Sequence, residues 1–197
     1  MSLIQLIAGL GNPGPEYAET RHNAGFWLLD ALLQQANGTW VSQSKFFGLA
    51  SRCQIGSQSV HVLKPTTFMN KSGQSVLAMA QFYKIPPEAI LVVHDELDIF
   101  PGEIRIKRGG GHGGHNGLRD LHRVLGDSYA RIRVGIGHPG HKSEVLNYVL
   151  GKPRMDDRNA MDDAIRATLS WLPDIVRGEW NAAMNALHQR QGDSSGI

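Results

Sequence analysis

Histidine, aspartate and asparagine gather at a few places in this sequence. The chain has 9 histidines in 197 residues, and four of them stand in short polar segments: His22, His94, His112 and His115. Asp95 directly follows one of these histidines, and such segments also contain Asn12, Asn70 and Asn116. A histidine can take a proton from water near neutral pH, a carboxylate can fix its tautomer, and an amide can donate to a developing oxyanion. These residue types favour hydrolysis by an activated water.

Two other chemistries use the same residue types. His112 and His115 are three residues apart, and His94 is followed by Asp95, so a mixed histidine and carboxylate zinc site is an alternative. The sequence has no H-E-x-x-H pattern, and its G-x-S-x-G match at 192–196 follows the last predicted helix, with no strand before it to form a nucleophile elbow. Cys53 stands in an apolar stretch, where a cysteine is usually structural. We expect no required metal and no covalent nucleophile.

The asparagines have a simpler interpretation as well. A single asparagine at the start of a helix is most often a turn residue or a cap. Three asparagines at three predicted strand ends make that interpretation weaker. Which of them donates to an oxyanion stays open at this point.

The elements that must position these residues follow from apolar periodicity. Short runs rich in β-branched residues predict strands at Leu3–Ala8, Ala50–Ile55, Ser59–Leu63, Ala89–Val93, Ile104–Lys107 and Ala130–Ile136. Apolar residues three and four apart predict helices at Ala24–Gln35, Ser72–Tyr83, Asp156–Trp171 and Asp174–Gln189, with Pro173 starting the last one. The GSQS turn predicts an antiparallel hairpin between the second and third strands. This pattern indicates an α/β fold with a mixed β-sheet flanked by helices on both faces.

The polar segments follow the predicted strands, where α/β proteins bind their ligands. Gly9, Gly11 and Gly14 have the spacing of a dinucleotide site. A dinucleotide site also needs a helix directly after these glycines and an acidic residue after the next strand, and the sequence offers neither. A tight turn that uses glycine explains the spacing equally well.

Composition limits the protein class. With 41% hydrophobic and 19% charged residues, residues 1–191 fit a single domain, and 192–197 are expected to form a flexible tail. The first residues lack a basic segment and a long apolar run, so we expect no membrane span and a cytosolic protein. One cysteine excludes an intramolecular disulfide. The formal charge of +2 is weak support for an anionic partner.

Four motifs carry a resemblance to a known family. They are GLGNPGPEYAETRHNAGF, KPTTFMNKSG, HDELDIFPGEIRIKRGGGHGGHNGLRDL and RIRVGIGHPG, in this order. Together they resemble the bacterial-type peptidyl-tRNA hydrolases, enzymes that cut the ester between a peptide and the 3′ end of tRNA. The likeness runs from Leu3 to about Pro153.

The resemblance implies a role for each matching residue. His22 matches the catalytic base, Asp95 the carboxylate that holds it, and Asn12 the residue associated with discriminating peptidyl-tRNA from aminoacyl-tRNA. The positions matching the substrate cleft and the tRNA 3′ end are Phe68, Asn70, Asn116 and Tyr17, with Met69 and His115 as further members of that wall. Lys107 and Arg133 match basic positions suited to acceptor-stem phosphates. The family also implies a monomer with tRNA as its partner, no cofactor and no obligate protein partner.

Three classes of function therefore compete. They are a metal-free esterase, a dinucleotide-dependent enzyme, and an RNA-binding protein without catalysis. The motifs favour them in that order.

Overall fold

Seven strands form one mixed β-sheet in a computed structural model that describes residues 3–189. The order is β2-β3-β4-β1-β5-β7-β6. Their bounds are β1 Leu6–Gly9, β2 Val41–Gln43, β3 Gly48–Ile55, β4 Gln58–Pro65, β5 Ile90–Glu96, β6 Ile104–Arg108 and β7 Ala130–Gly135. The expected tail at 192–197 lies outside the described residues.

The centre of the sheet is parallel and its two edges are antiparallel. β1 pairs in parallel with β4 and β5, and β5 pairs in parallel with β7. The predicted hairpin is confirmed as the antiparallel pair of β3 and β4, while β6 is antiparallel to β7. The carboxyl ends of four parallel strands therefore meet at one edge of the sheet, where an α/β fold places its ligands.

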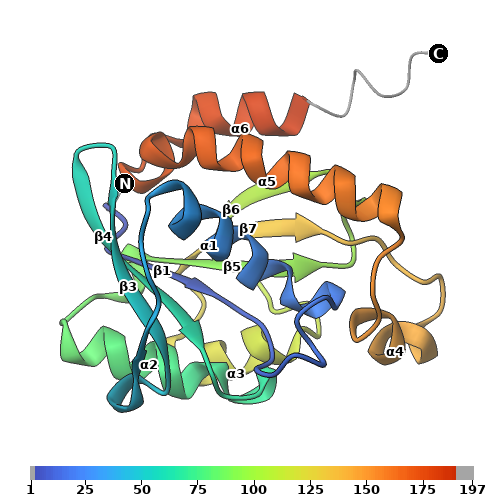
Figure 1. Cartoon of the computed structure of the whole chain (residues 1–197), viewed down its shortest axis with the longest axis horizontal. Helices are drawn as coiled ribbons and strands as arrows, with labels where there is room; N and C mark the ends of the chain where they lie inside the picture. The colour runs from blue at the N-terminus through green and yellow to red at the C-terminus, as the bar shows by residue number, and fades with distance from the viewer. Residues whose placement is uncertain (1–2, 190–197) are drawn as a thin grey trace.

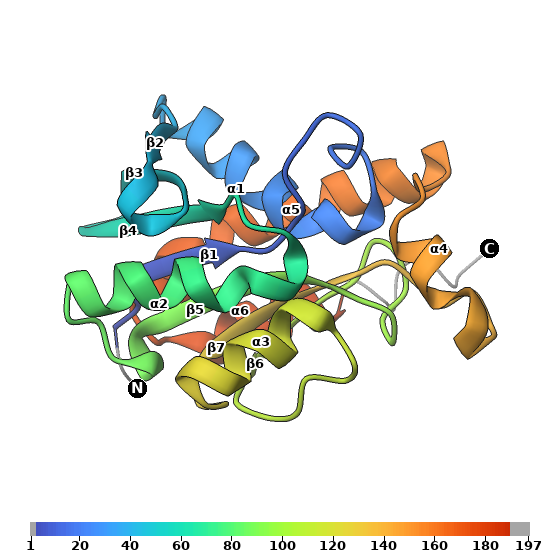
Figure 2. The ribbon, with the colours of Figure 1, turned by 90° about the horizontal axis from the view of Figure 1, so that it is seen from below.

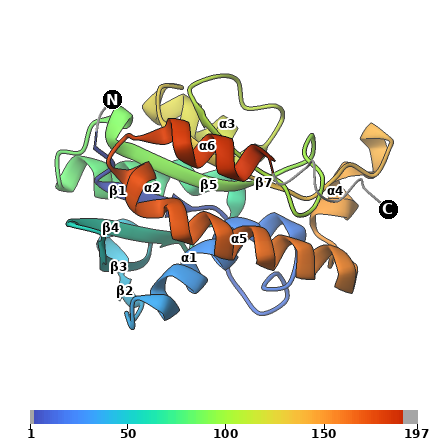
Figure 3. The same cartoon turned by 90° about the horizontal axis from the view of Figure 1, so that it is seen from above.

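Helices cover both faces of the sheet, which confirms the predicted fold class. α1 (Ala24–Gln35), α5 (Met155–Val176) and α6 (Trp180–Gln189) lie on one face, and α2 (Ser72–Phe82) and α3 (Asn116–Leu125) lie on the other. Figure 1 shows α5 and α6 above the sheet and α2 and α3 below it. Figures 2 and 3 show these two layers from below and from above. The short α4 (Val145–Val149) lies beyond one end of the sheet (Figure 1).

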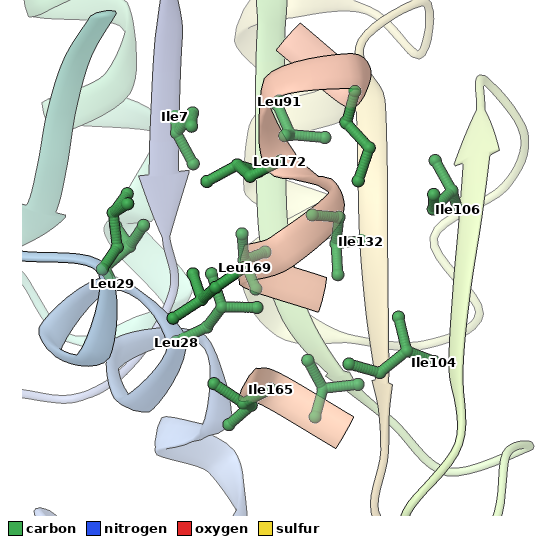
Figure 4. Packing of buried hydrophobic residues seen from close by; sticks show 14 of the residues in the cluster. Ile7, Leu28, Leu29, Leu91, Ile104, Ile106, Ile132, Ile165, Leu169 and Leu172 are labelled. Carbon is green, nitrogen blue, oxygen red and sulfur yellow. The ribbon is translucent and has the colours of Figure 1, made fainter. Parts of the chain in front are cut away.

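Alternation along the strands supplies each face with its own core. On β1, Ile7 belongs to the core with α1 and α5, whereas Leu6 and Ala8 belong to the core with α2 and α3, as a period of two requires. Figure 4 shows Ile7 and Leu91 of the sheet together with Leu28 of α1 and Leu169 of α5. This packing fixes the strand ends that carry the polar segments.

The predicted boundary between the last two helices was wrong. Pro173 lies inside α5, and α6 begins at Trp180. A proline inside a helix costs about 3 kcal/mol, but Leu172, Ile175 and Val176 are at most 1% exposed, and each such burial contributes roughly 1.5–3 kcal/mol. The helix ends instead before Gly178, whose φ of 81° suits the glycine that follows a helix end.

Candidate active site

The predicted catalytic residues converge at the carboxyl edge of the sheet. Asn12 lies in the loop after β1, and His22 lies in a 3-10 turn (Arg21–Asn23) that leads into α1. Asp95 is inside β5, one residue before the strand ends, and not after the strand as the sequence suggested. The end of β1 lies close to α1: a Cβ on Gly9 would be 2.6 Å from the carbonyl oxygen of Gly25. Glycine at this position therefore allows the strand end and the helix to come together.

A single carboxylate joins two histidines. Oδ2 of Asp95 is 2.9 Å from Nδ1 of His22, and Oδ1 is 2.8 Å from Nε2 of His115. Asp95 is 3% exposed and His22 is 7% exposed. The resemblance placed His115 in the substrate wall, whereas its ring nitrogen here faces the carboxylate. Both carboxylate oxygens thus have a histidine partner.

The first turn of α3 fixes the tautomer of His115. Its Nδ1 accepts hydrogen bonds from the backbone N–H groups of Gly117 at 3.1 Å and Leu118 at 3.3 Å. A neutral imidazole has one N–H, so the proton of His115 is on Nε2 and is donated to Asp95. The other carboxylate oxygen then accepts the Nδ1–H of His22. Nε2 of His22 keeps its lone pair, which a general base needs.

Burial and charge oppose each other at this cluster. Burial lowers the pKa of His22, but the Asp95 carboxylate more than offsets it, so the pKa is raised overall. Burial raises the pKa of Asp95, yet His22 and His115 together hold it well below its usual range. Behind them, burial lowers the pKa of His94 to about 3. Asp95 is therefore ionised and His94 neutral near pH 7.

The same three residues form the only cluster in the described chain with metal-ligand spacing. Ligand atoms of His22, Asp95 and His115 lie within 4.8 Å of one another. A metal on Nε2 of His115 would move the ring proton to Nδ1, where it would face the N–H groups of Gly117 and Leu118. The hydrogen bonds therefore fit the acid–base arrangement better than a metal.

Asn12 is held from three sides. Its backbone N–H donates to Oδ1 of Asn23 at 2.9 Å, and its backbone carbonyl accepts from Nδ2 of Asn23 at 2.9 Å. Its own Oδ1 accepts the backbone N–H of Met69 at 2.7 Å. The side-chain amide is thereby oriented, and its N–H donors remain for a ligand.

The remaining predicted wall residues stand around Asn12 at the same edge. Met69 is buried in a 3-10 turn (Met69–Lys71), and Phe68 before it is 58% exposed. The ring of Tyr17 meets that of Phe68 edge-on at 6.4 Å. Asn70 and Asn116 are exposed, and Oδ1 of Asn116 accepts from Arg119. The structure therefore brings these residues to the sheet edge that also carries His22, Asp95 and His115.

The predicted phosphate-binding residues lie on the β6–β7 ladder. Lys107 is opposite Arg131, and Arg133 follows two residues later on β7, so all three share one face. Lys107 is exposed, whereas Arg133 is ion-paired with Glu96 at 2.7 Å. This basic face begins beside β5, which carries Asp95.

Two residues of the site were missed from the sequence. Asn23 clamps Asn12, and the only signal for it was its place directly after His22. Arg131, 2% exposed, donates 2.6 Å hydrogen bonds to the carbonyls of Gly110 and Gly111, so it holds the glycine loop that leads to His115. An arginine within the predicted strand Ala130–Ile136 was a signal that could have been noticed.

A dinucleotide site requires a helix that begins directly after its glycines, and the structure places none there. Helix α1 begins only at Ala24, ten residues after Gly14, so no helix N-terminus follows the glycines to receive a pyrophosphate.

Within residues 3–189, no helix is long and apolar enough to cross a membrane.

Comparison with known proteins decides the family. Residues 6–195 match the sequence profile of the peptidyl-tRNA hydrolases. The chain belongs to the peptidyl-tRNA hydrolase family. A peptidyl-tRNA hydrolase of Delftia acidovorans is 52% identical over 187 residues, which are 94% of this chain and 90% of the relative. One of Neisseria gonorrhoeae is 53% identical over 188 residues, which are 95% of this chain and 98% of the relative.

The fold of this chain also matches that of a solved peptidyl-tRNA hydrolase. The crystal structure of peptidyl-tRNA hydrolase from Acinetobacter baumannii superposes with a TM-score of 0.92 at 51% identity, over 95% of this chain and 96% of that one. The resemblance stated from the four motifs is thus confirmed, and it extends beyond Pro153 into the C-terminal helices.

Proposed function

We propose that this enzyme hydrolyses the ester bond between a peptide, or an N-blocked aminoacyl group, and the 3′-terminal ribose of tRNA. The reaction would recycle tRNA from prematurely released peptidyl-tRNA. The observation that carries the proposal is the Asp95 carboxylate with one histidine at each oxygen, 2.9 and 2.8 Å away, in a chain of the peptidyl-tRNA hydrolase family.

In the proposed reaction, His22 is the general base. Its Nε2 takes a proton from water, and the oxygen attacks the ester carbonyl carbon. The imidazolium that forms is stabilised by Asp95, as in other histidine–carboxylate pairs. The tetrahedral intermediate then expels the ribose oxygen, which takes the proton back from His22. No metal or cofactor is needed, because an ester has a good leaving oxygen.

Amide donors would stabilise the oxyanion. The N–H groups of Asn12 are oriented by the bond from Met69 to its Oδ1, which makes Asn12 the best-positioned donor and fits its implied role in recognising an N-blocked substrate. Asn70 and Asn116 offer further amides at the cleft. Loss of one such donor lowers kcat about 100- to 1000-fold in another acyl-transfer enzyme.

The tRNA would meet the basic face beside β5. Lys107 is exposed there, and among residues 3–189 no carboxylate forms an ion pair with it. The ion pair with Glu96 holds the guanidinium of Arg133 in place. Phosphate contacts carry no sequence information, so we infer activity on many different peptidyl-tRNAs. We also infer a cytoplasmic monomer without an obligate protein partner, which rests on the family resemblance.

The test compares N-acetylaminoacyl-tRNA with its unblocked counterpart, with and without chelator. Wild type should cleave only the blocked substrate and ignore the chelator, and His22→Ala should nearly abolish cleavage. His61→Ala is the matched control, because His61 lies on β4 stacked on Tyr83, away from Asp95. No cleavage by wild type, or loss with chelator and recovery with zinc, would contradict the proposal.

A further inference from the structure

A mainly apolar cavity of about 250 Å³ lies beside Asn12. The loop after β1, the start of α1, the start of β3 and the end of β4 line it, and it is open to solvent. Its apolar walls come from Phe26, Trp27, Leu49 and Pro65. The mechanism above does not use this cavity.

The cavity borders the site of the catalytic base at the loop after β1. In the sheet, β1 stands between β4 and β5; Pro65 of the cavity is on β4, and Asp95 is on β5. Asn12 and Asn23 line the cavity, and Asn23 is the residue directly after His22. An acyl carbon held at His22 and recognised by Asn12 is therefore next to the cavity.

The charges in the cavity are already paired with each other. Nζ of Lys64 is 2.6 Å from Oδ1 of Asp30, and it also lies over the rings of Phe26 and Trp40. Among the lining residues of the described part of the chain, no other side chain is charged. The basic face suited to phosphate is on β6 and β7, at the opposite edge of the sheet from β3 and β4. The cavity is thus suited to a neutral, apolar group and not to the tRNA backbone.

We propose that this cavity binds the side chain of the amino acid whose carboxyl group is esterified to tRNA. The proposal rests on the proposed function and adds to it the location of the acyl residue. A cavity of about 150 Å³ in another protein binds benzene, so this one has room for a phenylalanine side chain. Small differences in the size of an apolar side chain change kcat/KM about tenfold to a hundredfold in other enzymes. The enzyme should accept all acyl residues but prefer large apolar ones by that factor.

The test measures kcat/KM for N-acetylphenylalanyl-tRNA and N-acetylglycyl-tRNA. Two variants fill the cavity from different walls at exposed positions, Ala18→Trp and Thr66→Trp. Gln81→Trp is the matched control, an exposed residue at a separate depression between α2 and α3. Wild type and the control should favour the phenylalanyl substrate about tenfold or more, and either filling variant should bring the ratio towards one.

Other outcomes overturn the inference. If wild type has similar kcat/KM values for the two substrates, the cavity does not bind the acyl side chain selectively. An equal loss for both substrates in the filling variants means that it holds a part common to all substrates, such as the terminal adenosine. Failure of wild type to cleave either substrate would instead contradict the proposed function itself.

Discussion

Replacing Asp95 by asparagine should put the wrong tautomer on His22. The cap of α3 keeps the His115 proton on Nε2, so the introduced amide must turn its oxygen towards His115. Its NH2 group then faces Nδ1 of His22, which must accept, and the ring proton moves to Nε2. The lone pair that should take a proton from water is lost.

The size and the pH dependence of the effect follow from the same contacts. The corresponding change in a serine-protease triad lowers kcat about 10⁴-fold, and general-base catalysis contributes about 10²- to 10⁴-fold. We expect a loss in this range, which corresponds to about 3–5 kcal/mol. Burial, which lowers the pKa of His22, persists, while the carboxylate that raises it is gone. The pKa should fall below 6.5, so the acid limb of kcat/KM should move to lower pH.

The assay is single-turnover hydrolysis of N-acetylaminoacyl-tRNA between about pH 5 and 9. Asp98→Asn is the control, the same substitution at an exposed position three residues away. The double variant Asp95→Asn with His115→Ala should be faster than Asp95→Asn alone, because the amide is then free to turn its oxygen to His22. A double variant no faster than the single one, or an acid limb that moves to higher pH, would refute the tautomer argument.

Three further predictions concern the surroundings of the site. Arg131→Met should release the glycine loop, so that kcat falls and hydrogen exchange rises at residues 109–115, whereas Arg52→Met on the exposed side of β3 should change neither. Leu28→Ala, at a fully buried position, should lower the free energy of unfolding in urea by about 2–5 kcal/mol. The pKa of His94 is about 3 when folded and 6.5 when unfolded, so the unfolded chain binds more protons between these values and stability should rise with pH there, by on the order of 4 kcal/mol. Thermal unfolding of His94→Gln should show a flatter rise across that window, and an unchanged one would contradict the buried neutral histidine.

The sequence was sufficient where local rules and tertiary structure agree. The central strands and both early helices have periodic apolar residues, and they form as predicted. His22 and Asp95 were identifiable as candidates because their types suit one reaction and their segments lie at the ends of strands that meet in the sheet. Their partners were harder to predict. The pairing of Asn12 with Asn23 depends on the 3-10 turn before α1, and no periodicity specifies that turn.

Pro173 shows the opposite case, in which a sound local rule fails. Proline commonly starts a helix, and nothing in the flanking sequence reveals that Leu172 and Ile175 both face the core. The gain from burying them appears only when the sheet is present to pack against. α3 was also missed, although Leu118, Leu121 and Leu125 recur three and four residues apart, the spacing of an amphipathic helix.

The missed helix also gives His115 a role that the predicted place in the substrate wall did not include. From motif position alone, His115 is one more polar residue at the cleft. Once α3 is known to begin at Asn116, the histidine becomes its N-cap, and the two backbone N–H groups decide which ring nitrogen holds the proton. That proton then decides which oxygen of Asp95 is available to His22. The tautomer of His22 therefore depends on a helix terminus, and weakening the cap should alter catalysis.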